Sequence, residues 1–141
     1  WAHTERHADL LRFTRELVHF ADRLPQLGRN RFWTVTSHLA KGDLSWHGVT
    51  LGKPDWTPLS HSLAWTLEGE RPAERVHVIA NAWWRELAFE LPPLPDGLRW
   101  HRIVDTSQPA PADITPGAAA QPVSGTSYPA SWHSVVVLRA L

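Results

Sequence analysis

Apolar residues recur at three- and four-residue intervals near the start of the chain, at Leu10, Phe13, Leu17, Phe20, Ala21 and Leu24. This spacing forms one apolar stripe on a helix, which we expect to span residues 4–23. Thr4 has the side chain of an N-cap, and Pro25 ends the helix because proline disfavours helical geometry at the preceding residue. Leu11 and Val18 widen the stripe, so the helix is expected to pack against something large.

From residue 43 onward the apolar period falls to about two residues, which is typical of β-strands. Strands are expected over residues 44–48, 61–67, 76–82, 87–91, 98–106 and 132–141. In the third of these, an inner face is expected from Val76, Val78, Ala80 and Ala82. The unbroken apolar run 135–138 predicts a central strand buried on both faces.

Residues 107–131 are rich in Pro, Ala, Gly and Ser, and are expected to form a long loop with one short strand near 122–125. The expected elements define the fold class as mainly β. We predict an antiparallel β-sandwich of about six to eight strands, preceded by one N-terminal α-helix.

Composition narrows the class of protein. The 141 residues fit one globular domain, and 14 basic against 14 acidic residues argue against binding to nucleic acid or to an anionic membrane. The absence of cysteine excludes a thiolate metal site and fits a reducing compartment, so we expect a cytoplasmic location. The chain begins at Trp1 and contains no Met, so it is expected to be a fragment or a processed chain.

Candidate catalytic and metal-binding groups are poorly arranged. A retaining glycosidase needs two carboxyl groups roughly 5–5.5 Å apart, whereas Glu86 and Glu90 on one strand would lie about 13 Å apart. His3 and His7 are one helical turn apart but lack the HExxH pattern. The other histidines considered, scattered over expected strands, are His47, His61, His77, His101 and His133. We therefore expect no catalytic, cofactor-binding or metal-binding residue, and no cofactor.

Nine tryptophans are the feature with a functional interpretation, because an indole can either fill a core or stack on a sugar. Trp65 and Trp100 fit inward positions and are expected in the core. Trp46 and Trp56 border a loop and could line a sugar-stacking surface. The consecutive 83–84 pair would point to opposite faces of a strand, so that one is buried and the other exposed.

Five stretches, in order, resemble the C-terminal part of bacterial glycogen debranching enzymes of the isoamylase type, within the α-amylase superfamily. They are RHADLLRFTREL at 6–17, LSWHGV with PDW and SHSLA between 44 and 64, NAWW with FELP between 81 and 92, WHRIVD at 100–105, and SVVVL at 134–138. The resemblance implies a last barrel helix within residues 1–28 and a C-terminal β-sandwich over 29–141.

The same resemblance implies the partners of this chain. They would be an upstream catalytic barrel in the same polypeptide and a branched α-glucan, hydrolysed at its α-1,6 linkages by the full-length enzyme. The family's catalytic carboxylates lie on barrel strands upstream of this helix, so none of them transfers to a residue here. Two alternatives stay open: a glucan-binding module that uses exposed Trp, and a non-catalytic protein-interaction domain.

Overall fold

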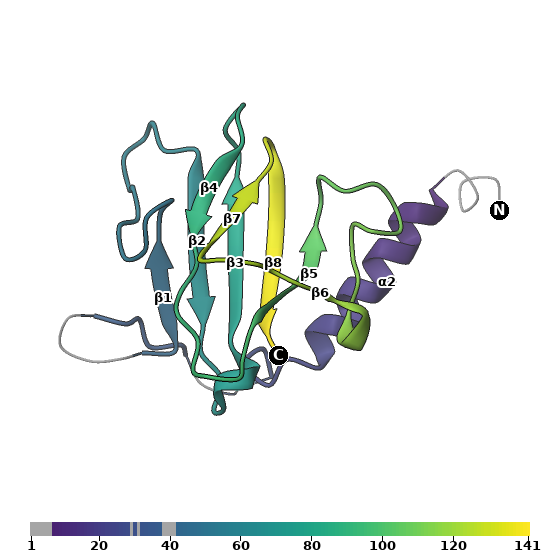
Figure 1. The fold of residues 1–141 in the computed structure, drawn as a ribbon, viewed down its shortest axis with the longest axis horizontal. Coiled ribbons are helices and arrows are strands. Elements are labelled where there is room, and N and C mark those ends of the chain that lie inside the picture. Colours follow the sequence, from purple (N-terminus) through teal and green to yellow (C-terminus); the bar gives the residue numbers. More distant parts are fainter. Residues whose placement is uncertain (1–6, 29, 31, 38–41) are drawn as a thin grey trace.

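The computed structural model describes residues 7–28, 30, 32–37 and 42–141 (Figure 1). Its elements are α2 (Ala8–Asp22), β1 (Leu44–His47), β2 (Ser62–Leu67), η1 (Pro72–Glu74), β3 (Val76–Asn81), β4 (Leu87–Glu90), β5 (Trp100–Asp105), η2 (Gly117–Ala119), β6 (Gln121–Pro122), β7 (Ser127–Ala130) and β8 (Ser134–Ala140). The predicted N-cap Thr4 and the candidate ligand His3 lie outside the described residues.

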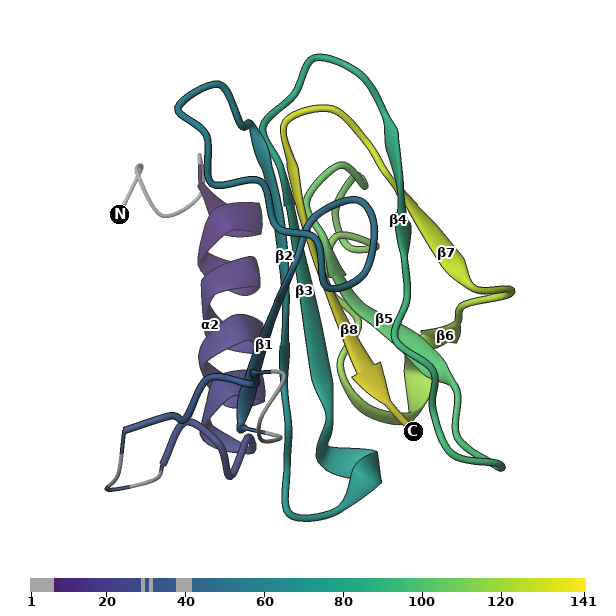
Figure 2. The same cartoon turned by 90° about the vertical axis from the view of Figure 1, so that its left-hand side faces the viewer.

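The strands form two antiparallel sheets. The larger has six strands in the order β1-β2-β3-β8-β5-β6, and β4 pairs with β7 in a sheet of two. Seen from the side, α2 lies over one face of the large sheet and β4-β7 over the other (Figure 2). The predicted fold class, a mainly β antiparallel sandwich with an N-terminal helix, is confirmed.

The central strand β3 is covered on both sides, whereas β8 is fully buried only on the face of Val136, Leu138 and Ala140. The predicted burial of β8 on both faces was therefore wrong in part, because Val135 is 41% exposed. Side chains of β3 alternate between the two cores: Val76 and Val78 pack on the helix side, whereas Ile79 packs between the sheets. The expectation of one inner face ending at Ala82 was therefore wrong, because Ala82 lies beyond β3 and is exposed. When both faces of a strand are covered, its sequence does not alternate between apolar and polar residues, so the pattern does not identify a single inner face.

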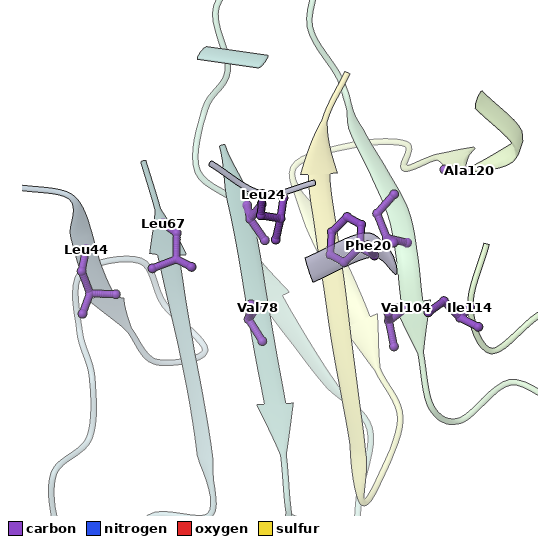
Figure 3. Packing of buried hydrophobic residues seen from close by; sticks show 10 residues of the cluster. Phe20, Leu24, Leu44, Leu67, Val78, Val104, Ile114 and Ala120 are labelled. Carbon is purple, nitrogen blue, oxygen red and sulfur yellow. The ribbon is translucent and has the colours of Figure 1, made fainter. Parts of the chain in front are cut away.

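The apolar stripe of α2 divides between the core and the surface. Phe20 and Leu24 are buried against strand residues that include Leu44, Leu67, Val78 and Val104 (Figure 3), and Phe13 packs against the same cluster. Arg12 adds an ion pair of 2.5 Å to Asp113 in the loop after β5. The remaining apolar residues of the helix, Leu10, Leu11, Leu17 and Val18, are exposed, and we call them the outer helix face.

Strand β7 is the element that the sequence did not predict, because Pro129 and the surrounding Ser and Gly indicated a loop. Proline is tolerated here because the sheet of β4 and β7 has only two strands, so each strand has a free edge. Tyr128 of β7 is opposite Phe89, and its hydroxyl donates to Asp105 of β5 at 2.7 Å. This bond links the two sheets.

Candidate functional site

Three exposed tryptophans lie on loops at one end of the sandwich. Strands β1, β3 and β7 end there, and β2, β4 and β8 begin there, at the top of Figure 1. The connecting loops, 48–61, 82–86 and 131–133, hold Trp56, Trp84 and Trp132, each more than half exposed at 64%, 65% and 60%. This end of the sandwich is the candidate site.

Asn81, the last residue of β3, fixes the backbone of this end. Its buried side-chain amide donates to the carbonyls of Arg85, Ala130 and Ser131 at 2.9, 3.0 and 3.0 Å, and its side-chain oxygen accepts from the Trp83 amide at 3.0 Å. One side chain therefore holds the loop 82–86 against the end of β7. Buried polar groups satisfied in this way make local geometry specific.

The aromatic rings on these loops form one cluster. The ring centroids of Trp83 and Trp84 are 4.6 Å apart, and the imidazole of His61 stacks on Trp83 at 5.3 Å and lies 5.9 Å from Trp84. The expectation that the two indoles point to opposite faces of a strand was wrong, because they lie in a bend after β3. Trp83 is half-buried and Trp84 is exposed.

A hollow of about 220 Å³ opens beside the cluster, lined by Asp55, Leu59, Ser60, His61, Ser62, Trp83 and Leu87. Asp55 is fully exposed and accepts a hydrogen bond from the Thr57 amide at 2.9 Å, which lowers the pKa of its carboxyl below the usual value. The lining of the hollow therefore includes an anionic acceptor, Asp55, and the aromatic rings of His61 and Trp83. The hollow is smaller than the roughly 300–1,000 Å³ typical of pockets for drug-sized ligands, so it fits part of a longer molecule.

The tryptophans predicted for the core and for a sugar surface lie as follows. Trp100 is buried and donates to the Pro92 carbonyl at 2.9 Å, as expected, and Trp65 is half-buried against the helix-side core. Trp46 is half-buried between Trp65 and Trp56, with ring centroids 6.0 and 5.6 Å away. The sequence predicted a sugar-stacking surface at Trp46 and Trp56, but the hollow is lined by Trp83.

A chain of buried hydrogen bonds joins β1, β2 and β3. The Gly52 amide donates to His47 Nδ1 at 2.9 Å, so His47 carries its proton on Nε2 and donates to Thr66 at 3.0 Å. The Thr66 hydroxyl is also hydrogen-bonded to His77 Nδ1 at 2.9 Å. Burial lowers the pKa of His77 to about 3 and also lowers that of His47, so both rings are neutral at physiological pH.

The carboxylates and histidines considered for chemistry are dispersed. Glu90 accepts from the Leu51 amide at 2.9 Å and holds the loop after β1, while Glu86 is exposed before β4. Within the described residues, no group of three or more His, Asp or Glu side chains could hold a metal ion. In the same part of the chain, no helix is long and apolar enough to cross a membrane. The expected lack of a catalytic residue stays a prediction.

The fold defines the class of this chain as a β-sandwich domain with an α-helix on one face of its larger sheet (Figure 2). Residues 45–134 match the family described as Isoamylase 1-3, C-terminal, and the chain belongs to this family. It is 37% identical over 113 residues to Isoamylase 1, chloroplastic, of Arabidopsis thaliana, and 35% identical over 114 residues to Isoamylase 1, chloroplastic, of Oryza sativa subsp. japonica. Isoamylase SU1, chloroplastic, of Zea mays is 34% identical over 110 residues.

These three alignments cover 79%, 81% and 78% of this chain but only 13% of each relative. The resemblance to the C-terminal part of isoamylase-type enzymes is thus confirmed. The predicted cytoplasmic location is contradicted, because the relatives are all named chloroplastic, including Isoamylase 3 of Oryza sativa subsp. japonica. A chain without cysteine fits several compartments equally well, so composition was a weak guide to location.

Proposed function

We propose that this chain is the C-terminal domain of a debranching enzyme whose full-length form hydrolyses α-1,6 linkages in glycogen or a related glucan. The observation that carries the proposal is the family match over residues 45–134. In the relatives the matched part is about an eighth of the protein, 13% of its length. We place the catalytic carboxylates in an upstream barrel, and the work of this domain is to support that barrel.

The outer helix face is the surface that we assign to this support. Leu10 and Val18 are 63% and 52% exposed, and Leu11 and Leu17 lie beside them on the same helix. On the adjoining side the same helix is fixed to the sandwich by Phe20, Leu24 and the Arg12–Asp113 ion pair. We therefore propose that residues 1–28 include the last helix of the barrel, and that 29–141 form the sandwich.

A protein-interaction domain without a role in glucan metabolism was the alternative that the wide apolar stripe suggested. Part of that stripe is buried within the domain, since Phe13, Phe20 and Leu24 pack against its own sheet. The exposed part covers one helix face, which suits a neighbouring region of the same polypeptide. The family match favours the debranching enzyme.

The activity can be tested with the longer polypeptide that contains this chain. We expect that polypeptide to release linear chains from glycogen, measured as new reducing ends, and the 141-residue chain alone to release none. Debranching by the 141-residue chain alone would contradict the assignment of catalysis to the upstream barrel. Lack of debranching by a correctly folded long form would contradict the assigned reaction.

The docking surface can be tested by two adjacent substitutions that add the same charge. Val18→Glu places a carboxylate on the outer helix face, whereas His19→Glu places one on an exposed position beside it. Burial of an unpaired charge is strongly unfavourable, so Val18→Glu should lower the thermal midpoint and the activity of the long form. In the 141-residue chain both variants should stay within about 0.5 kcal/mol of wild type. Equal effects of the two variants in the long form would refute docking through this face.

A further inference from the structure

The indole of Trp84 is exposed but held in place. Its ring is 65% exposed and rests against Trp83, whose centroid is 4.6 Å away at an interplanar angle of 32°. The backbone of the same loop is fixed by Asn81, and the His133 amide donates to the Trp83 carbonyl at 3.3 Å. A ring that is already ordered loses little conformational freedom when a ligand stacks on it.

Polar groups lie next to this ring. The lining of the adjoining hollow includes Asp55, Ser60 and His61, and the imidazole of His61 stacks on Trp83. A pyranose ring has an apolar face of C–H groups and a rim of hydroxyl groups. The indole can stack on the apolar face, and the hydroxyl groups can bond to a carboxylate, an imidazole and a hydroxyl. Apolar and polar groups therefore converge here as a sugar site requires.

We propose that this hollow and Trp84 form a binding site for an α-linked glucan chain, with one glucose ring stacked on Trp84 and a neighbouring ring hydrogen-bonded to Asp55. The site would hold a chain of the substrate on the accessory domain, outside the catalytic barrel. The choice of an α-glucan depends on the proposed debranching function, whereas a sugar site as such depends only on the geometry.

A larger hollow of the described chain is less suited to a sugar. It measures about 510 Å³ and lies between residues 91–100 and 122–126, with mostly proline and aliphatic side chains and Arg99 as its one charged residue. Its tryptophan, Trp100, is buried and donates its indole N–H to the Pro92 carbonyl. No exposed aromatic ring is therefore available there for stacking.

The proposal is tested by titrating the ¹⁵N-labelled 141-residue chain with maltoheptaose and following the indole N–H signals. We expect the signals of Trp83 and Trp84 to shift. Trp84→Ala should weaken binding at least about tenfold, equivalent to ~1.4 kcal/mol. The matched control is Trp56→Ala, since Trp56 is equally exposed at 64% but packs edge-on against Trp46 and does not line the hollow. This control should bind within about twofold of wild type.

Three outcomes would overturn the proposal: no shift of these indole signals, unchanged affinity of Trp84→Ala, or an equal loss in Trp56→Ala. Equal binding of cellohexaose, a β-linked chain, would overturn the choice of an α-glucan. None of these results bears on the debranching assay of the long polypeptide, so failure of the glucan site and failure of the proposed function are distinguishable.

Discussion

His77 allows a quantitative prediction about the pH dependence of stability. The ring is buried in β3, is hydrogen-bonded to Thr66 through Nδ1, and has a pKa lowered from 6.5 to about 3 by burial. In the unfolded chain the same ring takes up a proton near pH 6.5. Because the unfolded state then binds one more proton than the folded state, acid favours unfolding.

The contribution of His77 is fully present above pH 6.5 and is lost as the pH falls towards about 3. Each pH unit below 6.5 corresponds to about 1.4 kcal/mol, so the loss between pH 7.5 and pH 5 is about 2 kcal/mol. The lowered pKa of His47 acts in the same direction. Asp55 and Glu74, whose carboxyl pKa values are lowered from 3.8 and 4.5, act mainly below this range.

The assay is urea unfolding of the 141-residue chain at several pH values between 7.5 and 5, followed by Trp fluorescence. His77→Gln removes the titrating ring and should flatten the pH dependence by about 2 kcal/mol, whatever its stability at pH 7.5. The control His19→Gln removes an exposed imidazole on α2 and should keep the wild-type slope. A His77→Gln variant that loses as much stability as wild type over this range would refute the reasoning.

Three further predictions concern the residues that hold the sandwich and its aromatic end. Burial and the bond to Asp105 raise the pKa of Tyr128, the single tyrosine, to about 12. Ultraviolet absorbance after a rapid pH jump should therefore show ionisation of this tyrosine near pH 12. A midpoint near pH 10 in the folded chain, the ordinary value, would contradict this. Asn81→Asp places a carboxylate against three backbone carbonyls, so the free energy of unfolding in urea should fall by about 3 kcal/mol or more. An unchanged urea midpoint would count against the role of Asn81 in holding the loop. Gly48→Ala would bring a Cβ to 2.3 Å from the Lys53 carbonyl oxygen and should cost about 1–3 kcal/mol. Gly28→Ala, whose nearest atom is 3.9 Å away, should change the unfolding free energy by less than about 0.5 kcal/mol, and equal losses in the two glycine variants would contradict the steric argument.

Several elements could be predicted because their sequence pattern records their burial directly. The alternation of Leu87, Phe89 and Leu91 with polar or small residues identified β4, and the run at 135–138 identified the central strand β8. In β4 the alternation reflects the one covered face of the strand, whereas in β8 the run also contains Val135, which is exposed. The helix was predicted for the same reason, with a start that lies outside the described residues and an observed end at Asp22.

The candidate site could not be predicted in the same way. Trp83 and Trp84 are consecutive, and on a strand they would point to opposite faces. Hydrogen bonds from Asn81 to Ala130 and Ser131, about 50 residues further along the chain, hold them in a bend instead. Their contact with His61 arises only because loops between different strands meet at one end of the sandwich. Nothing local in the sequence specifies that meeting.

The sequence by itself determined the mainly β class, the amphipathic helix and the family, because periodicity and local motifs are properties of neighbouring residues. The tertiary structure decided which part of the helix stripe is buried, that β7 pairs with β4 despite Pro129, and that His77 is neutral. Each of these depends on contacts between residues distant in the chain. Such contacts determine burial and local dielectric, and a pattern of neighbours does not contain them.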